Sequence, residues 1–578
     1  MAYQFFQNFD FSGGLNIRHQ TAEIFPNECI VSQNWISNGR AIEVLPGYTK
    51  YNEAPIPGSI LNPINSLFRF VKPSEPSVKR FLAQSGNGVW VANEVQKTWN
   101  LLIGGLYADS SMEFVTHGDQ YCYMVNGYDG LKKYNGTAVS TVSNAPNGVT
   151  ITGHYNRLMI AGGPEYPGRI YWSNPGAPDE WDVVNQFQEI PSTQGDPITK
   201  ILFFLDGTII FKGYSIWRIQ SNFEPFPVFN ISDEIGCPAK KSVVVYGDKI
   251  FWFGSTGHIY CYDRASIRNL TAEKIGALPV AANRRADVCC SIVDGRLWVS
   301  YCTENSNESF NNTLMICDIT FLDSPRWFGP HKGFHINCFS SFKESEDVFF
   351  GDANTSTVWR KGTNYYFGKN FNGTTTAGSA ASLTVSTAGT SIAENELAGC
   401  VIELIGGSGQ GQRKIITANT PFDAQGEVLT GTIIVSEEWN PVPTEDTVWE
   451  IGAIDARYRT GILSFQMPER QKLFDKVFLH AESAGAHYLT IEVIKNHLDY
   501  GNQYFYSLLG TATIWDTAIW DESDFSSPDM LDNYVDLDYE NAKYLNLEFS
   551  LKGRGLPAFL YGYILMFQID DLLNFDGT

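Results

Sequence analysis

The sequence has few of the residues and patterns that mark enzymes with polar active sites or metal centres. Only 18% of its 578 residues are charged, and only nine are histidines. The patterns H-E-x-x-H, G-x-S-x-G and C-x-x-C do not occur, so the common signatures of zinc proteases, α/β-hydrolases and zinc or redox sites are missing. Convincing helical periodicity is scarce. We therefore expect an all-β protein that is not an enzyme and has no cofactor or metal site.

Long hydrophobic runs are also missing. The longest apolar stretch, from Ala558 to Ile569, is too short to span a bilayer and is better interpreted as a buried strand. The first residues carry neither a basic flank nor an apolar core, so no signal peptide is expected. Most of the ten cysteines sit in apolar strand contexts, as in Tyr121-Cys122-Tyr123. This predicts buried thiols in a reducing compartment.

Basic residues are outnumbered, because 41 Lys and Arg face 63 Asp and Glu and give a formal charge of -22. Such a chain repels phosphate and anionic membrane surfaces. This disfavours a protein that grips DNA. It allows one past which DNA must slide without sticking.

What the sequence does contain is one pattern repeated seven times: an apolar strand, a tight turn, an aromatic-rich strand and a third strand that closes on Tyr or Trp. The turns lie at Asn87, Asp119, Asn156, Asp206, Asp248, Asp294 and, most weakly, Asp347. Their average spacing matches one four-stranded propeller blade. A single blade cannot bury both faces, so the repeats should close radially. We predict a β-propeller of about seven blades, with six or eight left open.

The composition divides the chain into four parts. Residues 1–62 are expected to form an extended arm and a hairpin with an Asn38-Gly39 turn, and residues 63–367 the propeller. Residues 368–453 are rich in small and β-branched residues, which predicts an inserted small β-barrel-like domain. Residues 454–578 return to alternating strands, which a C-terminal β-sandwich fits best.

Three features invite a chemical interpretation and favour a structural one. The glycine-rich segment 406–411 lacks the Gly-Lys-Ser/Thr ending of a phosphate loop and is expected to be a hairpin turn. His331 and His335 are four residues apart, but Pro330 and Gly333 argue against a helix that would bring them together. The turn aspartates recur at the same place in successive repeats, which indicates turn geometry rather than a glycosidase site.

The charge pattern is more informative. Between Asn496 and Ala542 there are ten acids and no Lys or Arg. This stretch is either a solvated acidic loop or a surface that repels a polyanion. A calcium-binding loop is disfavoured, because the acids do not have the regular spacing of calcium ligands. The candidates for DNA-repelling channel residues are Asp516, Asp521, Glu522, Asp524, Asp529 and Asp532, and the other four acids are Asp499, Asp536, Asp538 and Glu540.

Three sequence features together resemble a protein family. Phe11-Ser12-Gly13-Gly14-Leu15-Asn16, the stretch Pro26 to Asn34 and Leu45-Pro46-Gly47-Tyr48 resemble the N-termini of tailed-bacteriophage tail proteins. The stretch from Thr376 through Gly409-Gln410-Gly411-Gln412 to Gly452 is similar to a small β module recurrent in phage virion proteins. The order of the parts is similar to tail nozzle, or packaged-DNA stabilisation, proteins of short-tailed phages.

This resemblance implies a structural virion protein in the tail, assembled in the bacterial host cytoplasm. It implies a homohexameric tube below a ring adaptor, with tail fibre proteins as neighbours and genomic DNA passing without tight binding. Two other classes stay open. A receptor-binding or fibre-like adhesin would need exposed aromatic patches, and a propeller glycosidase or lyase would need clustered carboxylates in its funnel.

Overall fold

The computed structural model describes residues 3–508 and 534–569, except Arg40, Thr193, Asn222, Asn305, Asn307, Glu344, Asp446 and residues 388–390, 426–427, 484–487 and 497–498. Within this part of the chain nearly all regular structure is β-strand. Its helices are two short 3-10 segments, η1 (Lys240–Ser242) and η2 (Ala282–Asp287). The all-β prediction is therefore confirmed.

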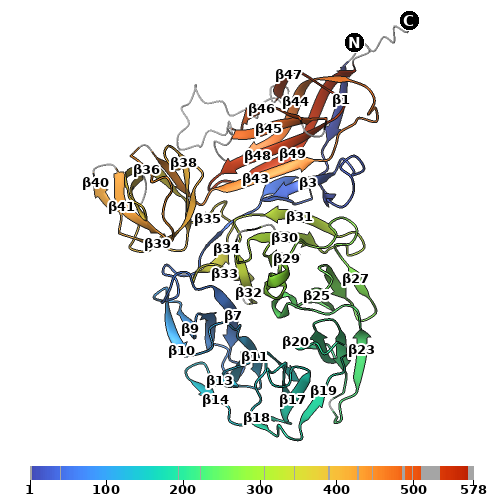
Figure 1. Ribbon diagram of the computed structural model, residues 1–578, viewed down its shortest axis with the longest axis vertical. Coiled ribbons are helices and arrows are strands. Elements are labelled where there is room, and N and C mark those ends of the chain that lie inside the picture. The colour runs from blue at the N-terminus through green and yellow to red at the C-terminus, as the bar shows by residue number, and fades with distance from the viewer. Residues whose placement is uncertain are drawn as a thin grey trace.

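Seven small antiparallel sheets follow one another around a ring (Figure 1). Their strands, sheet by sheet, are β7 (Ile64–Val71), β8 (Lys79–Ser85), β9 (Gly88–Asn93) and β10 (Thr98–Ile103); β11 (Glu113–His117), β12 (Tyr121–Val125), β13 (Lys132–Tyr134) and β14 (Val139–Thr141); β15 (Thr150–His154), β16 (Arg157–Ala161), β17 (Arg169–Asn174), β18 (Ala177–Trp181) and β19 (Phe187–Glu189); β20 (Ile198–Phe204), β21 (Gly207–Lys212), β22 (Ile216–Ile219) and β23 (Val228–Ser232); β24 (Val244–Tyr246), β25 (Lys249–Phe253), β26 (Ile259–Tyr262) and β27 (Ile267–Asn269); β28 (Cys289–Val293), β29 (Arg296–Tyr301), β30 (Thr313–Asp318) and β31 (Arg326–His331); and β32 (Ile336–Phe342), β33 (Asp347–Asp352) and β34 (Val358–Lys361).

The predicted repeat corresponds to these sheets. Six of the seven turns lie before or at the start of the second strand of a sheet, namely β12, β16, β21, β25, β29 and β33. In the first sheet the turn at Asn87 lies one strand later, before the third strand, β9. First strands of neighbouring sheets contact one another, as β7 does with both β11 and β32, so the first strands surround the centre of the ring. Apolar clusters lie between successive sheets and also join the last sheet to the first, where Phe349 packs with Phe81.

The last sheet of the ring is completed by a strand from the other end of the chain. β6 (Tyr48–Lys50) pairs antiparallel with β34 and parallel with β35 (Phe367–Gly368). Tyr48 lies opposite Lys361, and Lys50 lies opposite Trp359. The ring therefore includes residues from the segment predicted as an arm.

Two six-stranded sheets at one end of the molecule form what we call the two-sheet unit (Figure 1). The first sheet contains β4 (Trp35–Ser37), β5 (Ile42–Val44), β49 (Ala558–Ile569), β44 (Lys472–Ser483) and β47 (Tyr534–Ala542), with β1 (Tyr3–Asn8) beside β49. The second contains β2 (Gly14–Leu15), β3 (Glu28–Gln33), β43 (Ile454–Thr460), β48 (Leu545–Gly553), β45 (Tyr488–Lys495) and β46 (Asp499–Ser507).

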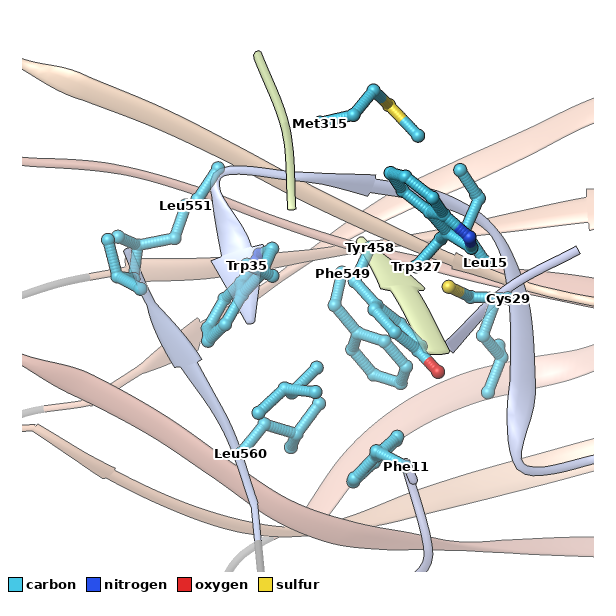
Figure 2. Packing of buried hydrophobic residues seen from close by; sticks show 14 of the residues in the cluster. Phe11, Leu15, Cys29, Trp35, Met315, Trp327, Tyr458, Phe549, Leu551 and Leu560 are labelled. Atoms are coloured by element: carbon cyan, nitrogen blue, oxygen red, sulfur yellow. The ribbon is translucent and has the colours of Figure 1, made fainter. Parts of the chain in front are cut away.

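Both ends of the chain therefore build this unit, and the predicted hairpin is present as the antiparallel pair β4–β5. Its core joins Trp35 and Tyr458 to Phe549, and it continues to Met315 and Trp327 of the ring (Figure 2). Trp327 is fully buried and its indole N–H donates to the carbonyl of Leu270 at 2.8 Å. The ring and the two-sheet unit thus share one hydrophobic core.

The inserted segment forms one seven-stranded sheet. In path order its strands are β37 (Ser382–Thr387), β36 (Phe371–Gly378), β42 (Val448–Ile451), β38 (Val401–Gly406), β39 (Arg413–Asn419), β41 (Val428–Val435) and β40 (Asp423–Gln425). β37 also pairs with β41, so the sheet curls around buried residues such as Leu383, Ile402 and Trp449. The glycine-rich segment joins β38 to β39 as a hairpin, as predicted.

The predicted burial of the cysteines is confirmed, because all ten of their side chains are buried. Trp252 and Trp298 are buried as well, at 0% and 3% exposed. Trp90 is only half-buried, because it packs at the margin of the cluster between the last and first sheets.

Candidate functional site: the cavity at the centre of the ring

The acidic residues proposed from the sequence fall mainly beyond the described residues. These are Asp516, Asp521, Glu522, Asp524, Asp529 and Asp532. Of the others, Asp499 begins β46, while Asp536 and Asp538 are exposed on the edge strand β47. Glu540 differs from them, because its carboxylate contacts the Lys495 Nζ at 2.8 Å and accepts a hydrogen bond from the Tyr504 hydroxyl. Burial raises the pKa of Glu540, but these partners bring it below its usual value.

The repeated turn aspartates do not converge on a shared site. Asp206 pairs with Arg218 and Arg264, Asp248 with Lys249, and Asp294 with Lys361. Asp294 also adopts a φ of 50°, which Asp tolerates in tight turns. These contacts agree with the structural role predicted for them.

Of the two histidines, His331 has a structural role. His331 is fully buried on β31, and its Nδ1 accepts a hydrogen bond from the backbone N–H of Asn34 at 2.9 Å. Burial lowers the pKa of His331 to about 3, so its imidazole stays neutral. Through the hydrogen bond with Asn34, the imidazole links the N-terminal segment to the ring of sheets. Within the described ranges, no cluster of three His, Cys, Asp or Glu side chains could hold a metal ion.

A cavity of about 840 Å³ lies at the centre of the ring, lined by residues at the starts of the first strands. One residue in or shortly before the first strand of each sheet illustrates the arrangement: Asn65, Ser111, Val149, Thr199, Lys240, Asp287 and Asn337. A second cavity of about 290 Å³ shares several of these residues and adds Glu113 and Lys200. The topology therefore brings side chains separated by nearly 300 positions to one place.

Three lysines line the second cavity: Lys200 from the fourth sheet, and Lys240 and Lys241 from η1, which precedes the fifth sheet. Lys200 on β20 pairs with the Glu113 carboxylate at 2.6 Å. The Nζ of Lys240, on η1, donates to the carbonyl oxygens of Ser111 and Val149, both at 3.0 Å. The Nζ of Lys241 donates to Asn337, at 3.0 Å to its backbone oxygen and 2.8 Å to its Oδ1. Two of the three ammonium groups thus donate to neutral oxygens only.

The environment of Lys240 alters its titration. Its pKa is lowered to about 8, chiefly by burial, and the charges of Lys200 and Lys241 act in the same direction, whereas Glu113 raises it. Sequence reasoning did not find this cluster, since nothing in the segment Pro238 to Lys241 marks it as facing the centre of the ring.

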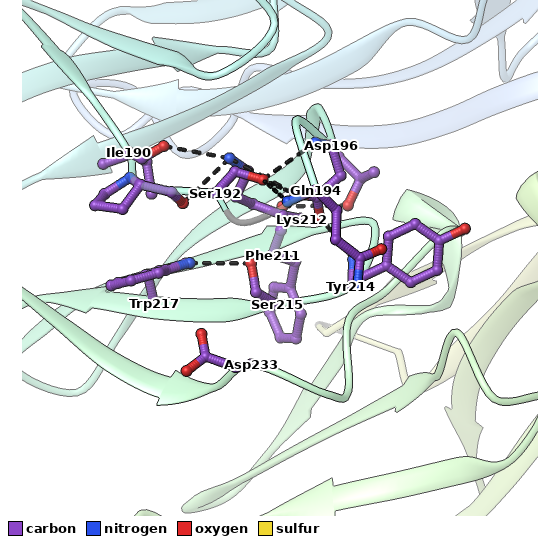
Figure 3. Close-up of polar contacts among 12 residues, drawn as sticks. Ile190, Ser192, Gln194, Asp196, Phe211, Lys212, Tyr214, Ser215, Trp217 and Asp233 are labelled. Atoms are coloured by element: carbon purple, nitrogen blue, oxygen red, sulfur yellow. Dashed lines mark hydrogen bonds and ion pairs between the residues drawn. The ribbon is translucent and has the colours of Figure 1, made fainter.

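A second buried cation lies within the fourth sheet (Figure 3). Lys212 on β21 is 1% exposed, and its Nζ contacts the carbonyls of Ile190 and Pro191 and lies 3.9 Å from the Asp196 carboxylate. Asp196 accepts hydrogen bonds from the backbone N–H of Tyr214 and from the Ser192 hydroxyl. Burial lowers the pKa of Lys212. These contacts anchor Ile190, Pro191 and Asp196 to the fourth sheet.

No family model matches the chain, and no curated protein matches it. Among solved structures, a computationally designed protein aligns over 54% of this chain and 99% of its own length, with 10% identity and a TM-score of 0.33. The extracellular domain of a putative hybrid two-component system from B. thetaiotaomicron aligns over 65% of this chain and 46% of its own, with 11% identity and a TM-score of 0.34. No helix among the residues placed in the structure is both long and apolar enough to cross a membrane.

Proposed function

We propose that the chain is a structural subunit of a tailed-bacteriophage virion, in which six copies form the tail nozzle that retains and releases the genome. The observation that carries this proposal is the mechanical coupling of the parts by the N-terminal segment. β1 to β5 lie in the two-sheet unit, and β6 completes the last sheet of the ring. A load applied to either part is therefore transmitted through paired strands.

In this proposal the ring is a seven-bladed β-propeller and the two-sheet unit a β-sandwich, with the inserted sheet as a small barrel-like domain. The cyclic series of apolar clusters supports radial closure, because each sheet buries both of its faces only if its two neighbours are other sheets. A strand borrowed from the N-terminal segment closes the circle.

The charge supports passage of DNA. Six copies at -22 each would carry 6 × -22 = -132 formal charges, which raises the energy of close phosphate contacts. The exposed Asp536 and Asp538 continue the acidic stretch onto the edge of the two-sheet unit. We propose that this stretch lines or rims the channel, and that a ring adaptor and tail fibre proteins bind the outer surfaces.

Electron microscopy of the purified full-length chain tests the proposal. Six-fold rings with a central opening are expected, and labelled duplex DNA should not bind them at physiological salt. A trimeric rod would instead favour a fibre-like adhesin. A protein that stays monomeric at virion-like local concentrations, with no ring under any condition that assembles the adaptor, would refute the nozzle.

A further inference from the structure

Basic residues outnumber acidic ones in the central cavities, although acids outnumber bases in the chain as a whole. Four basic residues line the two cavities, and three acids accompany them: Asp109, Glu113 and Asp287. Lys200 pairs with Glu113, and Arg284 pairs with Asp287 at 3.2 Å. The cavity thus has a local excess of positive charge in a chain whose formal charge is -22.

Lys240 and Lys241 are responsible for this excess. Neither has an ion-pair partner within 4.0 Å among the described side chains, and each donates only to neutral oxygens. An ammonium group carries three N–H donors, so each lysine has one donor left over. Two such donors in one partly enclosed space attract an anionic group more strongly than exposed lysines do.

The remaining lining is suited to a sugar. It offers neutral amides, including those of Asn62 and Asn354, which can donate to and accept from sugar hydroxyls. It also presents the ring of Tyr128, which is 53% exposed and is stacked on Tyr107 with 4.2 Å between ring centroids. The volume of about 840 Å³ falls within the roughly 300–1,000 Å³ typical of small-molecule sites.

We propose that the cavity at the centre of the ring binds a monosaccharide-sized acidic sugar. Its carboxylate or phosphate takes the remaining ammonium donors of Lys240 and Lys241, and its apolar face lies against Tyr128. This binding site does not depend on the nozzle proposal, because all of its residues belong to a single copy of the chain.

Isothermal titration of the full-length protein with three probes tests the inference. Glucuronate and glucose 6-phosphate are expected to bind, and neutral glucose is expected not to. The first two probes also show whether the site prefers a carboxylate or a phosphate. Substituting Lys241→Met should weaken binding of the preferred anion roughly tenfold to a hundredfold, since a charge-assisted hydrogen bond is lost. Lys249→Met is the matched control, because Lys249 pairs with Asp248 outside the cavity, and it should bind like the wild type.

Substituting Lys240 would also remove its hydrogen bonds to the carbonyls of Ser111 and Val149, so it is a poor test. Tyr128→Ala provides the second test instead, because Tyr128 is exposed and its replacement does not threaten folding. This variant should bind both glucuronate and glucose 6-phosphate more weakly than the wild type. Binding should also fall as the pH rises through about 8, where Lys240 loses its proton near Lys200, Lys241 and Glu113. The inference is overturned if neither anion binds, if glucose binds equally well, or if Lys241→Met and Tyr128→Ala both bind like the wild type.

Discussion

Removal of the Tyr48 side chain should open the ring at its seam. Tyr48 lies on β6, the strand that completes the last sheet, and is 7% exposed. Its ring contacts Phe334, Phe350, Trp359 and Phe367, with centroid separations between 4.8 and 5.5 Å. Its hydroxyl donates to the carbonyl of Gly333 at 2.7 Å. A single side chain therefore joins the N-terminal strand to residues about 300 positions later.

The size of the effect follows from these contacts. Tyr48→Ala should lower the free energy of unfolding by about 3–5 kcal/mol, as for other buried aromatic-to-Ala changes. Tyr48→Phe keeps the packing and leaves the Gly333 carbonyl without its donor, so a loss of about 1–2 kcal/mol is expected. Tyr246→Ala, at a position that is 49% exposed, should stay within about 0.5 kcal/mol of the wild type.

Urea denaturation measures these differences, and hydrogen exchange locates them. A multi-part chain need not unfold in one step, so exchange at β34, the partner of β6, is the more direct measurement. Exchange at β34 should accelerate more than exchange at β21, on the far side of the ring. A loss below about 1 kcal/mol for Tyr48→Ala, or equal acceleration at both strands, would show that β6 does not hold the seam.

Three further predictions test other parts of the molecule. Trp298→Ala should cost about 3–5 kcal/mol by urea denaturation, because the side chain is 3% exposed in the core between the last two sheets, and a loss below about 1 kcal/mol would contradict this. Between about pH 8 and 10.5 the unfolded state keeps the Lys240 proton that the folded state has lost, so this residue makes the free energy of unfolding rise with pH. Lys240→Met should flatten that part of the stability curve, and an unchanged curve would contradict the prediction. Lys at four acidic positions should make assembled rings bind DNA in a gel-shift assay, less so at 1 M salt, whereas Asn or Gln there should leave both folding and the lack of binding intact. Those four positions are Asp521, Glu522, Asp524 and Asp529.

The repeated sheets could be predicted because their signal is local. An Asn or Asp turn followed by an alternating apolar strand specifies a hairpin within about ten residues, and seven such hairpins recur. The closing strand could not be predicted in this way. Tyr48–Lys50 is three residues long, and its partners Trp359 and Phe367 lie more than 300 positions away. The pairing of Cys29 with Thr460 in the two-sheet unit could not be predicted for the same reason, because the two residues are far apart in the sequence.

The contacts of charged side chains were equally hard to predict from the sequence. The stretch from Asn496 to Ala542 contains no Lys or Arg, which suggested an unpaired acidic surface. Glu540 is nevertheless neutralised by Lys495, one residue before that stretch. The cavity lysines carry no local signal either, because their significance depends on which ends of the first strands face the centre. Charge patterns along a sequence therefore predict net repulsion better than they predict particular contacts.

Two glycines of the N-terminal motif lie where the chain passes close to the backbone of other parts of the molecule. Gly14 has a φ of 72°, and a Cβ at this position would lie 2.7 Å from the carbonyl oxygen of Trp327 in the ring. A Cβ at Gly47 would collide with the carbonyl oxygen of Tyr366. The backbone passes so close to its neighbours at both points that only glycine fits. Between these two contacts the chain contributes β3, β4 and β5 to the two-sheet unit. Relative motion of the ring and the two-sheet unit would therefore have to separate these close contacts and the hydrophobic core that the two parts share.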